Sequence, residues 1–264
     1  MAKLKSKSGK WALYGDANAQ IVVCGHSHAA SILGATINPE MQAGSVPAIA
    51  VCYAADLSGM TGPPDGQEYW DFVVNSSRGK HVVIVWNGNQ HNAHFMFQTE
   101  PKFTMLGVPD SDNDPQTIPI PRTMMKEFFR PSFEELREII PLLSDATTIT
   151  LLNGPAPKPV SHIQKCILRE QYFADLTKSL GLDVDDFVIT SDSLRLELWN
   201  VLVELLASYA RTLGTNFISA PAVSRDARGL LLPEYWIPDV THANSKYGLL
   251  LIEEIRKLIE NVPN

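Results

Sequence analysis

The sequence predicts an α/β fold with a parallel, doubly wound sheet, and three observations support this prediction. Short apolar runs bounded by glycine, asparagine and proline recur along the chain. These runs are apolar on both faces, as expected of strands buried between two helix layers. Segments with apolar residues at three- and four-residue steps lie between them, as in amphipathic helices. Strands that alternate with helices indicate parallel pairing with right-handed crossovers.

Five apolar runs are the predicted strands, taken in chain order. The first run ends at Gly25, the third at Asn87 and Gly88, and the fourth at Asn153. Such endings are typical of strands that stop at a turn or loop. The predicted strands cover residues 21–24, 48–53, 81–86, 147–152 and 215–219.

Four amphipathic segments are the predicted helices. The first covers residues 132–143 and begins with Ser132 followed by Glu135, the Ser-x-x-Glu pattern of a capping box. The other three show apolar residues on one face and charged or polar residues on the other. They cover residues 162–180, 194–213 and 247–259.

Residues 97–131 do not fit this alternation. They contain six prolines and an acidic turn at residues 110–114. A loop of this length inside a compact domain is usually a lid, a binding loop or a disordered insert. We interpret it as a proline-rich insertion after the third strand. It lies within a single domain of residues 21–264, which follows an N-terminal extension of residues 1–20.

The charge balance narrows the class of partner. The 264 residues include 22 Lys and Arg against 29 Asp and Glu, which gives a net charge of −7. A chain without a basic field is not expected to bind nucleic acid or anionic lipid. A small molecule held by local contacts is the more suitable ligand, and the sequence leaves the oligomeric state open.

Cysteine spacing and hydropathy predict the compartment. Cys24, Cys52 and Cys166 form no CxxC pair and no disulfide framework, as in proteins of a reducing compartment. The basic start of the chain lacks the apolar core of a signal peptide. No apolar run of about 18 residues occurs, so no membrane span is expected. We therefore expect a cytoplasmic protein.

Polar blocks follow the predicted strands at their carboxyl ends, where open α/β sheets bind ligands. Ser27 follows the first strand, Gly59 the second and Asn89 the third, and the pair Asp239 and His242 lies near the C-terminus. A serine hydroxyl becomes a nucleophile when a base lies within hydrogen-bond reach. His242 is the candidate base and Asp239 the residue that orients it. The N–H groups of Ser27 and Gly59 and the amide of Asn89 are candidate donors to an oxyanion.

These four blocks, in this order, resemble the SGNH hydrolase superfamily, also called GDSL-type esterases. Residues 25–27 match its Gly-Asp-Ser block, 57–61 its glycine block, 87–90 its Gly-x-Asn-Asp block and 239–242 its Asp-x-x-His block. The resemblance implies a flavodoxin-like, three-layer α/β/α sandwich. It also implies hydrolysis or transfer of an acyl ester, such as an O-acetyl group on a sugar or small molecule. We expect no cofactor.

Three positions depart from the family pattern. His26 replaces the usual Asp, Asn87 the usual Gly, and Gln90 the second Asp. In the family these neighbours support the loops and do not transfer the proton. The resemblance is therefore to an atypical subgroup in which the serine, histidine and aspartate are all present.

The histidines leave other functions open. His26 and His28 form one pair, and His91 and His94 form another in a loop expected to lie next to it. Neutral imidazoles often bind zinc or other transition metals, so a metal-dependent phosphoesterase is one alternative. The order of the blocks disagrees with metallophosphoesterases, so no metal ligand is predicted. His26, His28, His91 and Asn153 are instead candidate substrate-binding residues. A non-catalytic binding protein is the other alternative.

Overall fold

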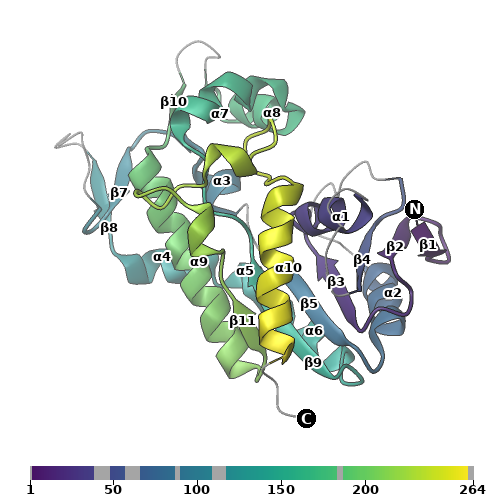
Figure 1. Ribbon diagram of the computed structural model, residues 1–264. Coiled ribbons are helices and arrows are strands. Elements are labelled where there is room, and N and C mark those ends of the chain that lie inside the picture. The colour runs from purple at the N-terminus through teal and green to yellow at the C-terminus, as the bar shows by residue number, and fades with distance from the viewer. Residues whose placement is uncertain are drawn as a thin grey trace.

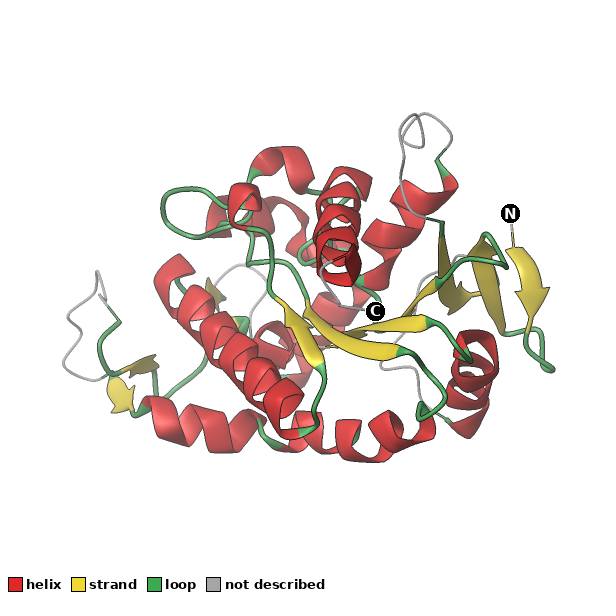
Figure 2. Cartoon of the chain, turned by 60° about the horizontal axis from the view of Figure 1, so that its bottom comes forward, coloured by secondary structure: helices red, strands yellow, loops and turns green. Residues whose placement is uncertain are grey.

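A computed structural model describes residues 2–38, 48–56, 66–86, 90–108, 117–182 and 187–260 (Figure 1). These residues form a mixed α/β fold around one seven-stranded, mostly parallel sheet. Helices lie on both faces of the sheet, so its central strands are buried on both sides (Figure 2).

Five strands are parallel, which confirms the five predicted runs as strands of a parallel sheet. They lie in the order β4-β3-β5-β9-β11. Their side chains, such as Val22, Val83 and Leu151, are buried and apolar because neither face of the sheet meets water. The strands are β3 Ile21–Gly25, β4 Ile49–Ala54, β5 His81–Trp86, β9 Thr148–Asn153 and β11 Asn216–Ile218.

The strand order reverses its direction between β3 and β5. The chain passes from β3 to β4 on one side and then to β5 on the other. Ligands of open α/β sheets bind outside the carboxyl ends of the strands at such a reversal. Those ends are Gly25 and Trp86 here, and Ser27 lies two residues beyond Gly25. The topology therefore brings Ser27 to this edge of the sheet.

The N-terminal extension is part of the sheet. Strands β1 Ala2–Lys5 and β2 Trp11–Gly15 form an antiparallel hairpin, and β2 also pairs antiparallel with β4. Ala12, Leu13 and Tyr14 of β2 are buried. The sequence analysis placed no strand here, although residues 11–14 form a short apolar run. The hairpin continues the sheet beyond β4 and so covers an edge that would otherwise have unpaired backbone groups.

The described helices alternate with the parallel strands, and none of them is long and apolar enough to cross a membrane. Two helix predictions are confirmed with small changes at their ends, 194–213 as α9 and 247–259 as α10. The helices are α1 Ala29–Ile37, α2 Gln67–Ser77, α3 Gln90–Phe95, α4 Arg122–Phe129, α5 Pro131–Glu134, α6 Leu136–Leu142, α7 Val160–Cys166, α8 Gln171–Ser179, α9 Asp192–Thr212 and α10 Ser245–Glu260.

The prediction of one continuous helix over 162–180 is wrong. The segment consists of α7, a 3-10 turn Ile167–Arg169, and α8, with a break at Glu170. Glu170 has extended backbone (φ −92°, ψ 116°), and its carboxylate accepts a hydrogen bond from the N–H of Val240. The hydrogen bond between Glu170 and the loop of Val240 thus accompanies a break in a segment whose apolar spacing predicts one continuous helix.

The predicted helix over 132–143 is also divided, into α5 and α6. Ser132 lies inside α5 and is not its cap, because Pro131 occupies the first helical position. Proline suits that position because the first backbone N–H of a helix has no partner within the helix. The capping-box prediction is therefore wrong, although the segment is helical on both sides of Glu135.

The proline-rich insertion contains regular structure where it is described. Strand β6 Phe97–Gln98 pairs with β10 Val188–Ile189, and β7 Phe103–Met105 pairs with β8 Ile118–Ile120. The ring of Phe95 lies 5.2 Å from that of Phe103 and 5.8 Å from that of Phe129 in α4. Aromatic packing anchors the segment to the domain, and the described part of the insertion therefore contains strands and a helix.

Helices α1 and α10 pack side by side at very close range (Figure 1). A Cβ atom on Gly248 would lie 2.0 Å from the carbonyl oxygen of Ser31, and one on Gly34 would lie 2.3 Å from Ser245 Oγ. Only glycine allows these backbones to approach so closely. Because α1 starts just after Ser27 and α10 just after His242, this contact also fixes the distance between those two residues.

Candidate active site

Ser27 lies in the turn between β3 and α1. Gly25, at the end of β3, has a positive φ of 110°, and a Cβ there would lie 2.3 Å from the carbonyl oxygen of Val85. Glycine is therefore required for the chain to turn so close to β5. The N–H of His26 donates to Val85 O (2.8 Å), and the N–H of Ala30 donates to Ser27 O (2.9 Å). These bonds hold Ser27 in place from both sides.

Asp239 and His242 lie in the loop that leads into α10. Asp239 Oδ1 accepts hydrogen bonds from the N–H groups of Thr241 (3.0 Å) and His242 (2.8 Å), which closes a tight turn. Asn244 Oδ1 then accepts from the N–H of Lys246 (2.9 Å), as an N-cap residue does at the start of α10. The sequence Asp-x-x-His thus folds into a turn that presents the carboxylate to the imidazole.

Ser27, His242 and Asp239 form a continuous hydrogen-bonded series. His242 Nδ1 lies 2.6 Å from Asp239 Oδ2, and His242 Nε2 lies 2.9 Å from Ser27 Oγ. The carboxylate can only accept, so Nδ1 carries the proton and Nε2 accepts from the serine hydroxyl. The His242 side chain is 26% exposed and that of Asp239 is 19% exposed, so a solute can reach the imidazole.

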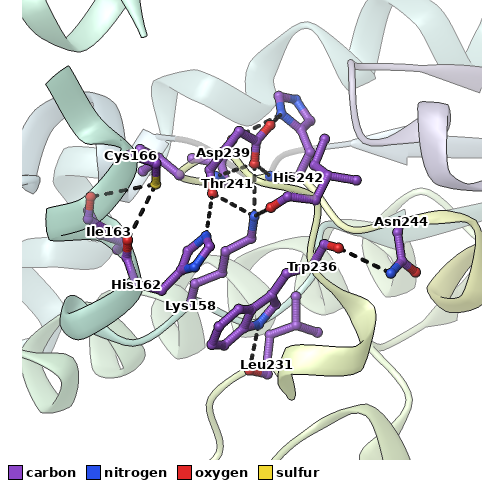
Figure 3. A network of polar contacts seen from close by, with 12 residues as sticks. Lys158, His162, Ile163, Cys166, Leu231, Trp236, Asp239, Thr241, His242 and Asn244 are labelled. Atoms are coloured by element: carbon purple, nitrogen blue, oxygen red, sulfur yellow. Dashed lines mark hydrogen bonds and ion pairs between the residues drawn. The ribbon is translucent and has the colours of Figure 1, made fainter. Parts of the chain in front are cut away.

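Lys158 is the functional neighbour that the sequence analysis did not single out. Its ammonium lies 2.8 Å from Asp239 Oδ1, and its side chain is completely buried (Figure 3). Burial raises the pKa of Asp239, but the hydrogen bond and charge of His242 and the Lys158 ammonium outweigh burial and hold this pKa well below its usual range. Burial lowers the pKa of Lys158, and the charge of Asp239 opposes that change. The only sequence signal was a lone lysine between prolines at residues 157 and 159.

One of the three candidate oxyanion donors can be located. The N–H of Ser27 has no hydrogen-bond acceptor among the residues that the structure describes, and it lies at the start of α1. Gly59 and Asn89 lie outside the described residues. Of the three predicted donors, the N–H of Ser27 is thus the one that lies within the described residues.

Histidines surround the series on its buried side. The ring of His28 lies 4.9 Å from that of His242, and the ring of His26 lies 4.5 Å from that of Trp86. The side chains of His28 and His91 are 5% and 1% exposed, and their ring nitrogens have no partner among the described residues. Burial lowers the pKa of His26 to about 4 and of His91 to about 3, and it holds the pKa of His28 well below its usual value. All three rings are therefore neutral near pH 7.

Because His91 is buried and neutral, we expect the free energy of unfolding to fall in acid. In the unfolded chain its pKa is near 6.5, so below that pH the unfolded state binds a proton that the folded state does not. The free energy of unfolding should fall by about 2 kcal/mol on this account between pH 7 and pH 5. Urea unfolding at both pH values should show a loss that is smaller by about this amount in His91→Gln than in the wild-type protein.

A matched control lies on the same helix. His94 is exposed, and its ring packs against that of Phe128 at 5.3 Å. The variant His94→Gln leaves the buried ring of His91 in place and should therefore retain the acid loss that this ring causes. Equal acid losses in His91→Gln and the wild-type protein would contradict the prediction.

Two other candidates take different places from those expected. Both atoms of the buried Asn153 amide are engaged, with Oδ1 accepting from the N–H of Ala220 (3.0 Å) and Nδ2 donating to Gly154 O (2.7 Å). Asn153 thus joins the end of β9 to the segment after β11. His94 is exposed whereas His91 is buried, and within the described ranges no three His, Cys, Asp or Glu side chains are grouped to hold a metal ion. The four-histidine site is not formed by these residues.

Comparisons with protein-family models and with curated proteins found no significant match. A functional assignment must therefore depend on the residues described above and on their geometry.

Proposed function

We propose that the protein is a serine hydrolase of SGNH type that cleaves a carboxylic ester through a covalent acyl-enzyme. Ser27 is the nucleophile, His242 the general base and acid, and Asp239 the residue that orients His242. One observation carries the proposal. Ser27 and His242 are 215 positions apart in the sequence, yet Ser27 Oγ lies 2.9 Å from His242 Nε2. Nδ1 of the same ring faces the carboxylate of Asp239. A serine, an imidazole and a carboxylate in this sequence are the parts of a nucleophilic triad.

In the first half of the reaction, Ser27 Oγ attacks the ester carbonyl while its proton moves to His242 Nε2. The carbonyl π-electron pair moves onto the oxygen, which becomes a tetrahedral oxyanion. The ionised Asp239 stabilises the imidazolium that forms. Collapse of the oxyanion then breaks the bond to the alcohol, which takes the proton from Nε2 and leaves. Ser27 remains as an acyl ester.

In the second half, water or another alcohol attacks the acyl-enzyme. His242 Nε2 now takes the proton of the attacking group and returns it to Ser27 Oγ as the second tetrahedral intermediate collapses. Water as the acceptor gives hydrolysis, and an alcohol gives acyl transfer. The enzyme regains its starting protonation in both cases.

Charge stabilisation in the two intermediates requires donors that point at the oxyanion. The N–H of Ser27 fits this role because no described residue accepts from it. We assign the other two donors to the N–H of Gly59 and the side-chain amide of Asn89. Their positions in the sequence, after β4 and β5, support this assignment.

The topology and the neighbouring side chains support the same class of enzyme. The parallel strands follow the order 2-1-3-4-5, the order of flavodoxin-like folds. The SGNH resemblance, which spans the serine block and the terminal Asp-x-x-His block, points to a short acyl ester such as an O-acetyl group. Neutral imidazoles at His26, His28 and His91 surround the site with no net charge, which suits a neutral small molecule or glycan.

Covalent labelling tests the proposal directly. A fluorophosphonate probe should react with the folded protein at one residue, and peptide mass spectrometry should place the adduct on Ser27. Prior unfolding in urea should abolish labelling, as should the variant Ser27→Ala. A non-catalytic binding protein of the same fold would leave the probe unreacted, and that result would overturn the proposal.

A further inference from the structure

We infer that Lys158 is a positioning residue of the site, one that holds the Asp239 carboxylate in a single orientation and limits how strongly it attracts the His242 proton. This inference rests on the proposed function, because it assigns Lys158 to the same triad. Its first support is the saturation of the ammonium group. Lys158 Nζ donates to Ile237 O (2.8 Å), Asp239 O (2.7 Å) and Asp239 Oδ1 (2.8 Å). An ammonium has three N–H groups, and all three are used.

The backbone of Lys158 is anchored on both sides. Arg195, which is buried, donates from Nη2 to Lys158 O (2.8 Å), and the N–H of Leu231 donates to Pro157 O (3.0 Å). Pro157 and Pro159 restrict the backbone on either side of the lysine. The lysine therefore extends from a rigid segment, and its four-carbon side chain is fixed at both ends.

The two carboxylate oxygens of Asp239 have different hydrogen-bond partners. Oδ1 accepts from Lys158 Nζ and from the N–H groups of Thr241 and His242, which leaves it no further capacity. Among the described residues, Oδ2 is hydrogen-bonded only to Nδ1 of His242. Lys158 and His242 approach the carboxylate from opposite sides (Figure 3). The carboxylate thus has one orientation available, and that orientation determines the plane of the imidazole.

The ammonium also has an electrostatic effect. A buried cation next to a carboxylate reduces the negative potential at the groups beyond it. Asp239 therefore holds the proton of His242 less strongly than an unpaired carboxylate would. A base that must accept a proton from serine and then release it to an alcohol benefits from such a balance.

Other titratable groups face this pair from the elements packed around it. His162 Nε2 lies 3.0 Å from Asp239 O, and its ring packs on Trp236 at 4.4 Å. Glu170 lies beside the loop through its bond to the N–H of Val240, and His28 lies beside His242. Compared with these groups, Lys158 alone donates to the Asp239 carboxylate, and the charge of Asp239 favours the protonated form of the lysine. Replacement of Lys158 therefore changes the charge next to the Asp239 carboxylate directly.

The test replaces Lys158 by a side chain of similar volume that carries no charge. In Lys158→Met, the acid limb of the pH profile of kcat/KM should move upward by about one pH unit, because the carboxylate then stabilises the imidazolium more strongly. A ¹⁵N NMR titration of the His242 ring should show the same displacement. A purely structural role for Lys158 would lower the yield or kcat equally at every pH and leave both midpoints in place.

Trp236→Phe is the matched control. Trp236 Nε1 donates to Leu231 O (2.9 Å) and helps to fix the same loop without contacting the carboxylate. This variant should change the rate without moving the midpoint. If Lys158→Met does not fold, Lys158→Gln retains hydrogen bonding without charge and should show the same upward displacement. An unchanged midpoint in the folded lysine variant would overturn the inference.

The two proposals fail in different ways. The NMR titration of His242 needs no substrate, so it reports on Lys158 even if the protein hydrolyses no ester. Absence of probe labelling on Ser27 would overturn the proposed function. A His242 midpoint that is equal in the lysine variant and the wild-type protein would overturn only the role of Lys158.

Discussion

Replacement of Ser27 by alanine should reduce kcat/KM for a short p-nitrophenyl ester by at least about 10³-fold. Without Oγ no acyl-enzyme forms, and water must attack the ester with only His242 and the oxyanion donors to assist it. The measurement is the initial rate of p-nitrophenol release at several substrate concentrations. Burst kinetics at high enzyme concentration should also disappear, because they report the acyl-enzyme.

Ser31→Ala supplies the comparison for this loss. Ser31 lies four residues further along in α1, is buried, and donates from Oγ to His28 O (3.0 Å). The same atomic deletion there removes a local hydrogen bond and should leave kcat/KM within a few-fold of the wild-type value. Similar rates for Ser27→Ala and the wild-type protein would place the chemistry elsewhere.

Replacement of Asp239 by asparagine should reduce kcat/KM by up to about 10⁴-fold. The three donors at Oδ1 hold the amide oxygen of the asparagine in that position. The amide NH₂ then faces His242 Nδ1 and donates to it, which moves the ring proton to Nε2. An imidazole protonated at Nε2 cannot accept from Ser27. NMR of the ring nitrogens should report this change of tautomer along with the loss of rate.

Asp226→Asn is the corresponding control. Asp226 Oδ1 also accepts from two backbone N–H groups, those of Arg228 (2.9 Å) and Leu230 (3.0 Å), but no histidine contacts it. Its replacement should lower the free energy of unfolding and leave kcat/KM near the wild-type value. A small effect of Asp239→Asn on the rate would mean that His242 does not depend on this carboxylate.

The parallel strands could be predicted because their signal is local. In β5, residues 82–86 are apolar without interruption, and a strand buried on both faces is the structure that suits such a run. The serine and the Asp-x-x-His pair could be singled out in the same way, since each follows a strand or precedes a helix. The order of the strands in the sheet and the distance between Ser27 and the Asp-x-x-His pair could not be predicted from these short segments alone.

The remaining features depend on contacts between distant residues. Lys158 bonds to a carbonyl 81 positions away, and the residues of β2 pair with residues of β4 that are 35 to 43 positions further along the chain. The break in the helical pattern at Glu170 follows from its bond to Val240. In each case the local sequence is compatible with another structure, and the tertiary contact decides between them.

The close packing of α1 on α10 has a consequence for the order of events during folding. The sheet can form from residues up to β11. The Ser27 hydroxyl and the His242 imidazole come within hydrogen-bond distance only when α10 packs on α1, with Gly248 against Ser31. A chain emerging from the ribosome therefore exposes Ser27 before the strands β4 to β11 and His242 after them. In a refolding experiment, the onset of ester cleavage would report the docking of α10 and would not report the formation of the sheet.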